Sequence, residues 1–170
     1  MRVLLVDDEA LALDRLRTLF ADIEDVELVG QATDGDMALA QIEALRPELV
    51  ILDIQMPGRN GLRTAAALPP EDRPEIIFVT AHEHYAPDAF EVDAADYLLK
   101  PVRFDRLRQA VTRARRRREL SRQAAESGKL QEEVQSLRAR GGGRAQDAGF
   151  WVPERHGQRW VPLDTIGWIE

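Results

Sequence analysis

Five short apolar runs recur at regular intervals along the first hundred residues. They are "VLLV" (3–6), "VELVG" (26–30), "LVILDI" (49–54), "IIFVT" (76–80) and "DYLLK" (96–100). Each has the length of a strand, and three are rich in β-branched residues. Runs that are apolar throughout are typical of parallel strands buried on both faces. The pattern therefore predicts a parallel sheet of five strands.

Segments with helical spacing of apolar residues separate these runs. The apolar positions of the first two are Leu13, Leu16, Leu19 and Phe20, then Met37, Ala38, Ile42 and Leu45. A third segment, "GLRTAAALPP", must end at its prolines because proline breaks a helix. Strands that alternate with helices indicate a doubly wound α/β fold, which we expect to end near Arg118.

Polar side chains follow the predicted strands at the point where each strand ends. They are Asp7, Asp8 and Glu9 after the first, Asp53 at the end of the third, Thr80 after the fourth, and Lys100 and Pro101 after the fifth. Open sheets of this type place their ligand site at the carboxyl ends of the strands. Each residue alone is common as a helix cap or surface residue, but their joint occurrence predicts one site.

The residue types in this cluster favour metal and phosphoryl chemistry. The loop "DDEALAL" is acidic and lacks glycine, which argues against a flavin or dinucleotide site. Carboxylates suit a hard divalent ion such as Mg²⁺ or Mn²⁺. Asp53 is the best nucleophile for phosphoryl transfer, with Lys100 and Thr80 placed to hold phosphoryl oxygens.

Four stretches, "LLVDDE", "LDIQMPGRNG", "VTAH" and "DYLLKP", resemble the receiver domains of bacterial two-component response regulators. The resemblance covers residues 1–118 and implies a flavodoxin-like receiver phosphorylated by a sensor histidine kinase. It implies that Asp53 is the phosphoacceptor and that Asp8, with Asp7 in support, binds Mg²⁺ together with Asp53 and the Gln55 backbone carbonyl. Thr80 and Lys100 would contact the phosphoryl group, and Thr80 and Tyr97 would be the switch residues. The peptide bond before Pro101 would be cis.

The remainder of the chain has the opposite charge. Up to Pro101 there are 8 Lys and Arg against 21 Asp and Glu, and beyond it 15 against 9. A helix over 103–140 would be about 57 Å long, too long to pack on one small domain. We expect residues 119–140 to be a helical linker with coiled-coil-like spacing. The run "RARRRR" (113–118) fits either phosphate contacts with nucleic acid or a solvated helix face, and we favour the latter.

The final residues resemble the opening of a LytTR-type DNA-binding domain. "GGGRAQDAG" (141–149) has the composition of a flexible linker, and 150–170 would begin an all-β output unit. About 20 residues fall short of the roughly 40 that fold unaided, so we expect an incomplete output domain. A short tail that docks on the receiver or on a neighbouring chain is the alternative. The stretch 82–102 also resembles the LytTR branch of the family.

These features predict a response regulator. Phosphorylation of Asp53 with Mg²⁺ would favour a homodimer and so DNA binding through the output domain. The chain has no cysteine and no apolar run of about 18 residues, so we expect a cytoplasmic protein without disulfides or a membrane partner.

Beyond slow self-dephosphorylation we expect no enzymatic activity. The rivals are a stand-alone receiver acting by protein contact and an aspartyl-phosphate phosphohydrolase. Phosphohydrolases of the haloacid dehalogenase type carry an aspartate as general acid two residues after the nucleophile. Here that position is Gln55, which argues against the phosphohydrolase.

Overall fold

The computed structural model describes most of the chain. The described residues are 1–70, 73–82, 85, 89, 91–141, 149–154 and 157–162. They form two compact units, Met1–Ser121 and Arg122–Glu170, and one continuous helix contributes to both.

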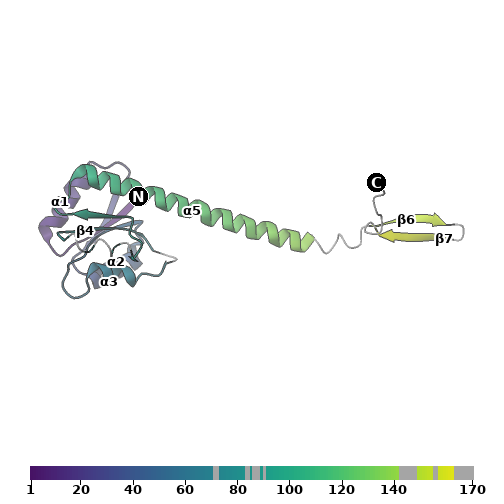
Figure 1. Cartoon of the computed structure of the whole chain (residues 1–170), viewed down its shortest axis with the longest axis horizontal. Helices are drawn as coiled ribbons and strands as arrows, with labels where there is room; N and C mark the ends of the chain where they lie inside the picture. The colour runs from purple at the N-terminus through teal and green to yellow at the C-terminus, as the bar shows by residue number, and fades with distance from the viewer. Residues whose placement is uncertain are drawn as a thin grey trace. The chain divides into compact units, whose positions relative to one another are not determined.

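In the described part of the chain, eight strands and helices of the first unit precede the long helix, and two strands follow it (Figure 1). In chain order the elements are β1 (Arg2–Val6), α1 (Ala10–Ala21), β2 (Glu27–Ala32), α2 (Gly35–Leu45), β3 (Leu49–Asp53), α3 (Gly61–Ala66), β4 (Glu75–Thr80), β5 (Asp96–Leu99), α5 (Phe104–Gly141), β6 (Gly149–Glu154) and β7 (Gly157–Pro162). The segment between β4 and β5 lies partly outside the described residues.

Strands β1 to β5 form one parallel sheet in the order β2-β1-β3-β4-β5. This is the flavodoxin-like order, and the strand order reverses between β1 and β3. The predicted doubly wound α/β fold with a five-stranded parallel sheet is therefore confirmed.

Both faces of the sheet are covered, as the apolar strands indicated (Figure 1). One face packs against α1 and the first turns of α5, through residues such as Phe20, Leu107 and Val111. The other packs against α2 and α3, through residues such as Ile42 and Ala65. All five residues of β3 are buried because the strand lies in the middle of the sheet.

Strand β2 departs from the expected pattern. It starts and ends later than the apolar run suggested, because its pairing with β1 extends to Val6 opposite Ala32. Leu28 on this strand is 38% exposed. The physical reason is that β2 forms the edge of the sheet, where the neighbouring layers cover less of the strand.

Two helices begin at side-chain caps that position the loops around the site. Asp34 accepts a hydrogen bond from the Met37 N–H at 2.8 Å at the start of α2. Asn60 does the same for the Arg63 N–H at 2.8 Å at the start of α3. Such caps satisfy backbone donors that the helix itself leaves unpaired.

Helix α5 runs for 38 residues, which confirms the long C-terminal helix. Its first turns bury Leu107, Ala110, Val111 and Ala114 against the sheet.

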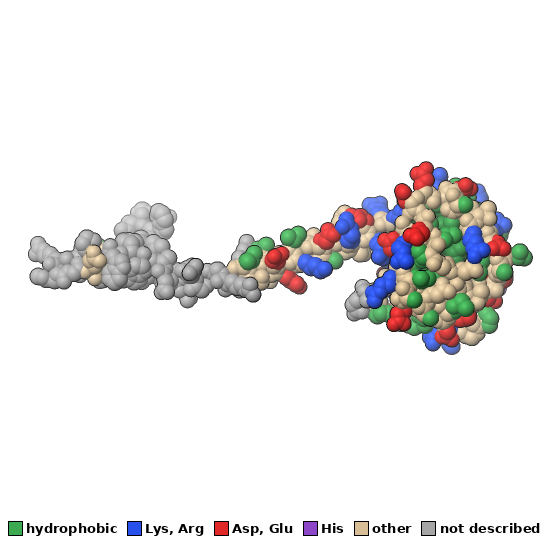
Figure 2. Space-filling model, turned by 180° about the vertical axis from the view of Figure 1, so that it is seen from behind, with side chains coloured by type: hydrophobic (Ala, Val, Ile, Leu, Met, Phe, Trp, Pro, Cys, Tyr) green, Lys and Arg blue, Asp and Glu red, His purple; other side chains and the backbone are tan. Residues whose placement is uncertain are grey.

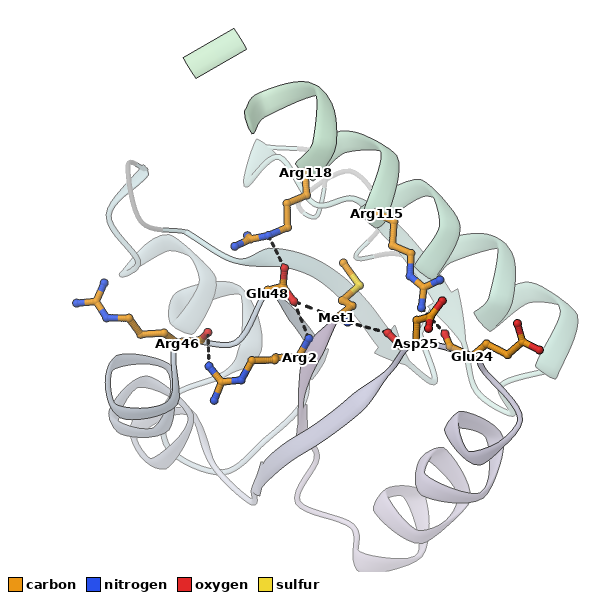
Figure 3. A network of polar contacts seen from close by, with 8 residues as sticks. All are labelled: Met1, Arg2, Glu24, Asp25, Arg46, Glu48, Arg115 and Arg118. Atoms are coloured by element: carbon orange, nitrogen blue, oxygen red, sulfur yellow. Dashed lines mark hydrogen bonds and ion pairs between the residues drawn. The ribbon is translucent and has the colours of Figure 1, made fainter. Parts of the chain in front are cut away.

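The basic run on α5 forms ion pairs with carboxylates of the first unit, and its paired guanidinium groups stay partly exposed. Its pairs are Arg113 with Asp96 at 3.3 Å, Arg117 with Glu75 at 3.2 Å and with Asp93 at 2.8 Å, and Arg118 with Glu48 at 3.2 Å. Arg115 donates to the Glu24 carbonyl at 2.5 Å (Figure 3). The acidic first unit attracts these guanidinium groups, so the charge split seen in the sequence is partly satisfied inside the chain.

In the second unit, β6 and β7 form an antiparallel hairpin in which Trp151 lies opposite Trp160. Both strands fall almost wholly within residues 150–170, where the sequence predicts the beginning of an all-β unit. Residues 142–148 of the expected linker and residues 163–170 lie outside the described part of the chain. Among the helices that the structure describes, none is long and apolar enough to cross a membrane.

Candidate functional site

Three carboxylates meet at the point where the strand order reverses. Asp7 and Asp8 follow β1, and Asp53 ends the neighbouring strand β3. One carboxylate oxygen from each lies within 4.8 Å of the others. Asp7 is fully buried and Asp53 is 5% exposed, whereas Asp8 is exposed. The fold thus brings together the acidic residues that the sequence placed at two separate strand ends.

Lys100 lies between the two buried carboxylates. Its Nζ is 2.8 Å from Asp7 Oδ2 and 3.0 Å from Asp53 Oδ2. Its backbone N–H donates to the Thr80 carbonyl at 2.8 Å, which ties the end of β5 to the end of β4. The Lys100–Pro101 peptide bond is cis. The ammonium group therefore links two strand ends across the site.

The electrostatics of the cluster are dominated by burial. Burial raises the pKa of the Asp53 carboxyl above its ordinary value, although the hydrogen bond and charge of Lys100 oppose this effect. Burial lowers the pKa of Lys100, but the hydrogen bonds that its ammonium group donates to Asp7 and Asp53 outweigh this effect, so the pKa of Lys100 is raised overall. The site contains an excess of negative charge in a poorly solvated place.

This donor set fits a hard divalent cation. Three carboxylates face a single ammonium group, and Mg²⁺ binds few protein carboxylates while it keeps several of its waters. The exposed Asp8 leaves the cluster open to solvent on one side, where such waters can lie. The acidic pocket therefore fits Mg²⁺, with Asp7, Asp8 and Asp53 as the side chains that would hold it.

Two backbone N–H groups orient the buried carboxylates, and sequence reasoning missed both. Gln55 donates its N–H to Asp53 Oδ1 at 3.2 Å, and Glu9 donates its N–H to Asp7 Oδ1 at 3.0 Å. In each case an aspartate binds the backbone two residues on, a turn that aspartate commonly forms. That spacing was the available signal. The predicted role of the Gln55 carbonyl stays a prediction.

Gly61 packs directly beneath Asp53. A Cβ atom at this position would lie 2.1 Å from the Asp53 carbonyl oxygen. The Gly61 N–H also donates to the Ile54 carbonyl at 2.9 Å. Gly58 has a different role, because its φ of 74° is one that other residues rarely adopt. The turn after β3 therefore needs one glycine for close approach and another for its backbone angle.

Thr80 and Tyr97 are connected through the backbone of His82. Thr80 is fully buried, and its Oγ1 accepts the His82 N–H at 3.4 Å. The Tyr97 hydroxyl donates to the His82 carbonyl. The two predicted switch residues thus share an intermediary. No sequence signal could have revealed it, because backbone atoms make the connection.

Tyr85 is a further residue that the sequence did not single out. Its hydroxyl accepts a hydrogen bond from Gln55 Nε2 at 3.3 Å, and its ring meets the His82 ring edge to face at 6.3 Å. The Tyr85 side chain therefore lies beside Gln55, which is two residues after Asp53.

Comparison with known proteins gives this geometry a family. The model of the response regulator receiver domain matches residues 3–112. The structure of the response regulatory domain of protein mrkE from Klebsiella pneumoniae is similar with a TM-score of 0.64 and 31% identity. The similar region covers 71% of this chain and 99% of the mrkE domain.

Two curated relatives are similar over the same region. The transcriptional regulatory protein BtsR of Salmonella typhi is 45% identical over 118 residues, which cover 69% of this chain and 49% of the relative. The positive alginate biosynthesis regulatory protein of Pseudomonas aeruginosa is 45% identical over 118 residues, covering 68% and 48%. The aligned part of the chain thus spans about half the length of these relatives. The similarity and the family match fall on the unit that carries Asp7, Asp53 and Lys100, and the chain belongs to the response regulator receiver domain family.

Proposed function

We propose that this chain is the receiver part of a two-component response regulator and accepts a phosphoryl group on Asp53. The observation that supports this most directly is the shared Lys100 ammonium, 2.8 Å from Asp7 and 3.0 Å from Asp53, at the switch point of the sheet. Ligands of doubly wound folds bind at this point. A buried nucleophile held by a central strand also has the fixed position that in-line transfer requires.

The transfer uses one carboxylate oxygen of Asp53 as the nucleophile. As its bond to phosphorus forms, the P–N bond of a phosphohistidine on the donor kinase breaks, and the imidazole leaves with the electron pair. Lys100 and Thr80 lie at the two neighbouring strand ends and would contact phosphoryl oxygens as charge develops on them. Gln55 and Lys100 hold the carboxylate of Asp53 in place before attack.

Mg²⁺, held by Asp7, Asp8, Asp53 and the Gln55 carbonyl, would neutralise phosphoryl oxygens when bound. Without such a cation, the carboxylates of the site would repel an anionic donor.

The switch in this proposal runs through His82. A phosphoryl group that draws Thr80 towards Asp53 would change the hydrogen bond between Thr80 and the His82 N–H. Tyr97, which donates to the carbonyl of the same residue, would then change its position. Such a shift moves a pre-existing equilibrium between two arrangements of the domain.

The same proposal extends to partners. A sensor histidine kinase donates the phosphoryl group in the cytoplasm, phosphorylation favours a homodimer, and a LytTR-type output domain that begins with the hairpin β6–β7 binds DNA. The relatives named as transcriptional regulators support this extension. In this proposal the chain is a phosphoacceptor, not an enzyme that turns over free substrates.

A small phosphodonor tests the site. Incubation with acetyl phosphate and Mg²⁺ should add one phosphoryl group to the intact chain, as measured by mass spectrometry. Asp53→Asn should remove this labelling, and a chelator should slow it by about tenfold or more. Asp22→Asn, at the exposed end of α1, is the matched control and should label normally. Equal labelling of Asp53→Asn would refute the assignment, and rapid turnover of an aryl phosphate would favour the phosphohydrolase.

A further inference from the structure

The distal part of helix α5 carries an exposed apolar stripe. Leu120, Leu130, Val134 and Leu137 are 56%, 62%, 44% and 60% exposed. They are four of the eight large hydrophobic side chains that are exposed in the described part of the chain. Figure 2 shows hydrophobic side chains standing on this part of the helix. Apolar side chains that gather on one exposed element often mark an interaction surface.

The spacing of the stripe is that of a coiled-coil seam. Successive members are ten, four and three residues apart, so all of them fall on the a and d positions of one heptad frame. In this frame the a positions are Leu120, Ser127 and Val134, and the d positions are Gln123, Leu130 and Leu137. The polar residues occupy two successive layers, and apolar layers flank them on both sides.

The stripe does not continue the face that packs on the sheet. That face consists of Leu107, Ala110, Val111 and Ala114, all buried. A helix advances about 100° per residue, so Leu130 points about 160° away from Ala114 around the axis. The apolar side of the helix therefore changes between Ala114 and Leu120. The distal stripe is accessible while the proximal face stays buried.

The charges beside the stripe favour one orientation of a partner helix. Glu119, Glu126 and Glu133 repeat every seven residues at g, whereas Ala124 and Gln131 occupy e. In a parallel pair, g faces e of the other helix, so each of Glu119 and Glu126 meets a neutral side chain. In an antiparallel pair g faces g, and the glutamates would repel one another. Within the same helix, Arg122 forms an ion pair with Glu126 at 2.7 Å, beside the seam.

We propose that residues 119–137 pair with the same segment of a second copy in a parallel, in-register, two-stranded coiled coil. A second copy in the same register places polar side chains opposite Gln123 and Ser127 in both polar layers, and apolar side chains opposite the leucines and the valine. The seam is therefore self-complementary, whereas a helix that is apolar at those two layers would leave polar groups facing apolar ones. The layers of Gln123 and Ser127 fix the register but weaken the seam, so the pairing depends on protein concentration. As a means of holding two output domains together, the pairing rests on the proposed function.

Cysteine cross-linking tests the register, because the chain contains no cysteine. Ser127→Cys places a thiol at an a position, where it would face its counterpart in the second copy. Ala125→Cys is the matched control, on the same turn but at the outer f position. With copper phenanthroline as oxidant, Ser127→Cys should form disulfide dimers about tenfold faster than the control. Equal rates, or a dimer that Ser127→Cys does not cross-link, would overturn the parallel register.

Sedimentation equilibrium tests the pairing itself. Leu130→Glu should weaken self-association by about tenfold or more, because it places two carboxylates in one core layer. Ala125→Glu adds the same charge at f and should associate like the wild type. Wild-type chains that stay monomeric at all accessible concentrations, or equal association of the Leu130 variant and the wild type, would overturn the inference.

Labelling of Asp53 by acetyl phosphate separates the two proposals. The Leu130→Glu variant should label at the wild-type rate, which also shows that its receiver is folded. If Asp53 is not labelled in the wild type, the proposed function fails. If labelling is normal but the Leu130 variant associates like the wild type, the coiled coil fails alone.

Discussion

The two ends of the parallel sheet carry the same kinds of charged side chain and use them differently. At the carboxyl end, Asp7 and Asp53 share Lys100, and burial raises the pKa of Asp53. At the amino end, Glu48 accepts the Arg2 N–H and an Arg118 N–H, and the pKa of Glu48 is lowered, chiefly by the Arg2 backbone (Figure 3). The carboxyl end keeps negative charge for a ligand, whereas the amino end neutralises its charge within the fold.

This difference separates function from stability. A cluster of carboxylates with too few cations costs folding free energy unless a metal or phosphoryl group completes it. The amino end has no such need, because Glu48 also lies 3.8 Å from the N-terminal ammonium of Met1. The pair of Glu48 with Arg118 also joins α5 to this end of the sheet.

Replacement of Gly61 by alanine should have the largest effect. The added Cβ would lie 2.1 Å from the Asp53 carbonyl oxygen, so the backbone that carries the nucleophile must move. We expect a loss of about 3 kcal/mol in the free energy of unfolding, measured by urea denaturation, together with slower labelling by acetyl phosphate. Gly58→Ala is the control. A Cβ atom at this position would meet nothing within 4 Å. The control should therefore lose only about 1 kcal/mol in the free energy of unfolding, because of the positive φ of Gly58. Equal losses in both variants would show that close packing under Asp53 is unimportant.

Lys100→Met should leave Asp7 and Asp53 buried without their cation. At neutral pH we expect a loss of about 2 kcal/mol in the free energy of unfolding, which shrinks as the pH falls and Asp53 becomes protonated. Mg²⁺ should raise the thermal midpoint of this variant more than that of the wild type, because the metal replaces the missing charge. Arg63→Met, on α3, is the control and should not change the response to Mg²⁺. A response of Lys100→Met equal to that of the wild type would argue against the carboxylate cluster as the metal site.

Glu48→Gln should be destabilising by at most about 1 kcal/mol, because Glu48 and Arg118 are both partly exposed and solvent screens the pair. The folded-state pKa of Glu48 is lowered from 4.5. Its contribution is therefore present above that value and is lost as the pH falls through the lower folded-state pKa. Urea denaturation from pH 7 to pH 3 should show the difference between variant and wild type vanish at the acid end. A difference that persists there would mean that Glu48 acts through packing.

Asp53→Asn should have the smallest effect and the opposite sign. The folded-state pKa of Asp53 is raised from 3.8, so ionisation of this carboxyl reduces stability as the pH rises through the folded-state pKa. The variant should be more stable than the wild type at pH 7, by less than about 1 kcal/mol, and equal to it near pH 3. A thermal melt at both pH values without added metal checks this. If the variant is less stable at pH 7, the two ends of the sheet do not differ in the proposed way.

Local patterns explain which parts of this protein were predictable. The apolar runs gave four strands within one residue of the observed bounds, because a buried strand must be apolar along its length. Strand β2 was placed less well, since edge strands need no such pattern. The convergence of Asp7, Asp53 and Lys100 followed from topology alone, because parallel strands end at the same edge.

The contacts that tune the site were not predictable in the same way. The bridge from Thr80 through His82 to Tyr97 uses backbone atoms that every sequence possesses. The partners of the basic run were equally hidden, because Arg113, Arg117 and Arg118 bind residues 17 to 70 positions away in the chain.

The sequence by itself determined the strands, the long helix and the identity of the acidic and basic groups at the strand ends. Periodicity and residue type are local properties, so they survive without a fold. The tertiary structure decided which of these groups are buried, which backbone donors orient them and which carboxylates are neutralised. Those outcomes depend on solvent exclusion and on contacts between residues far apart in the chain, and both arise only when the sheet and its helices pack together.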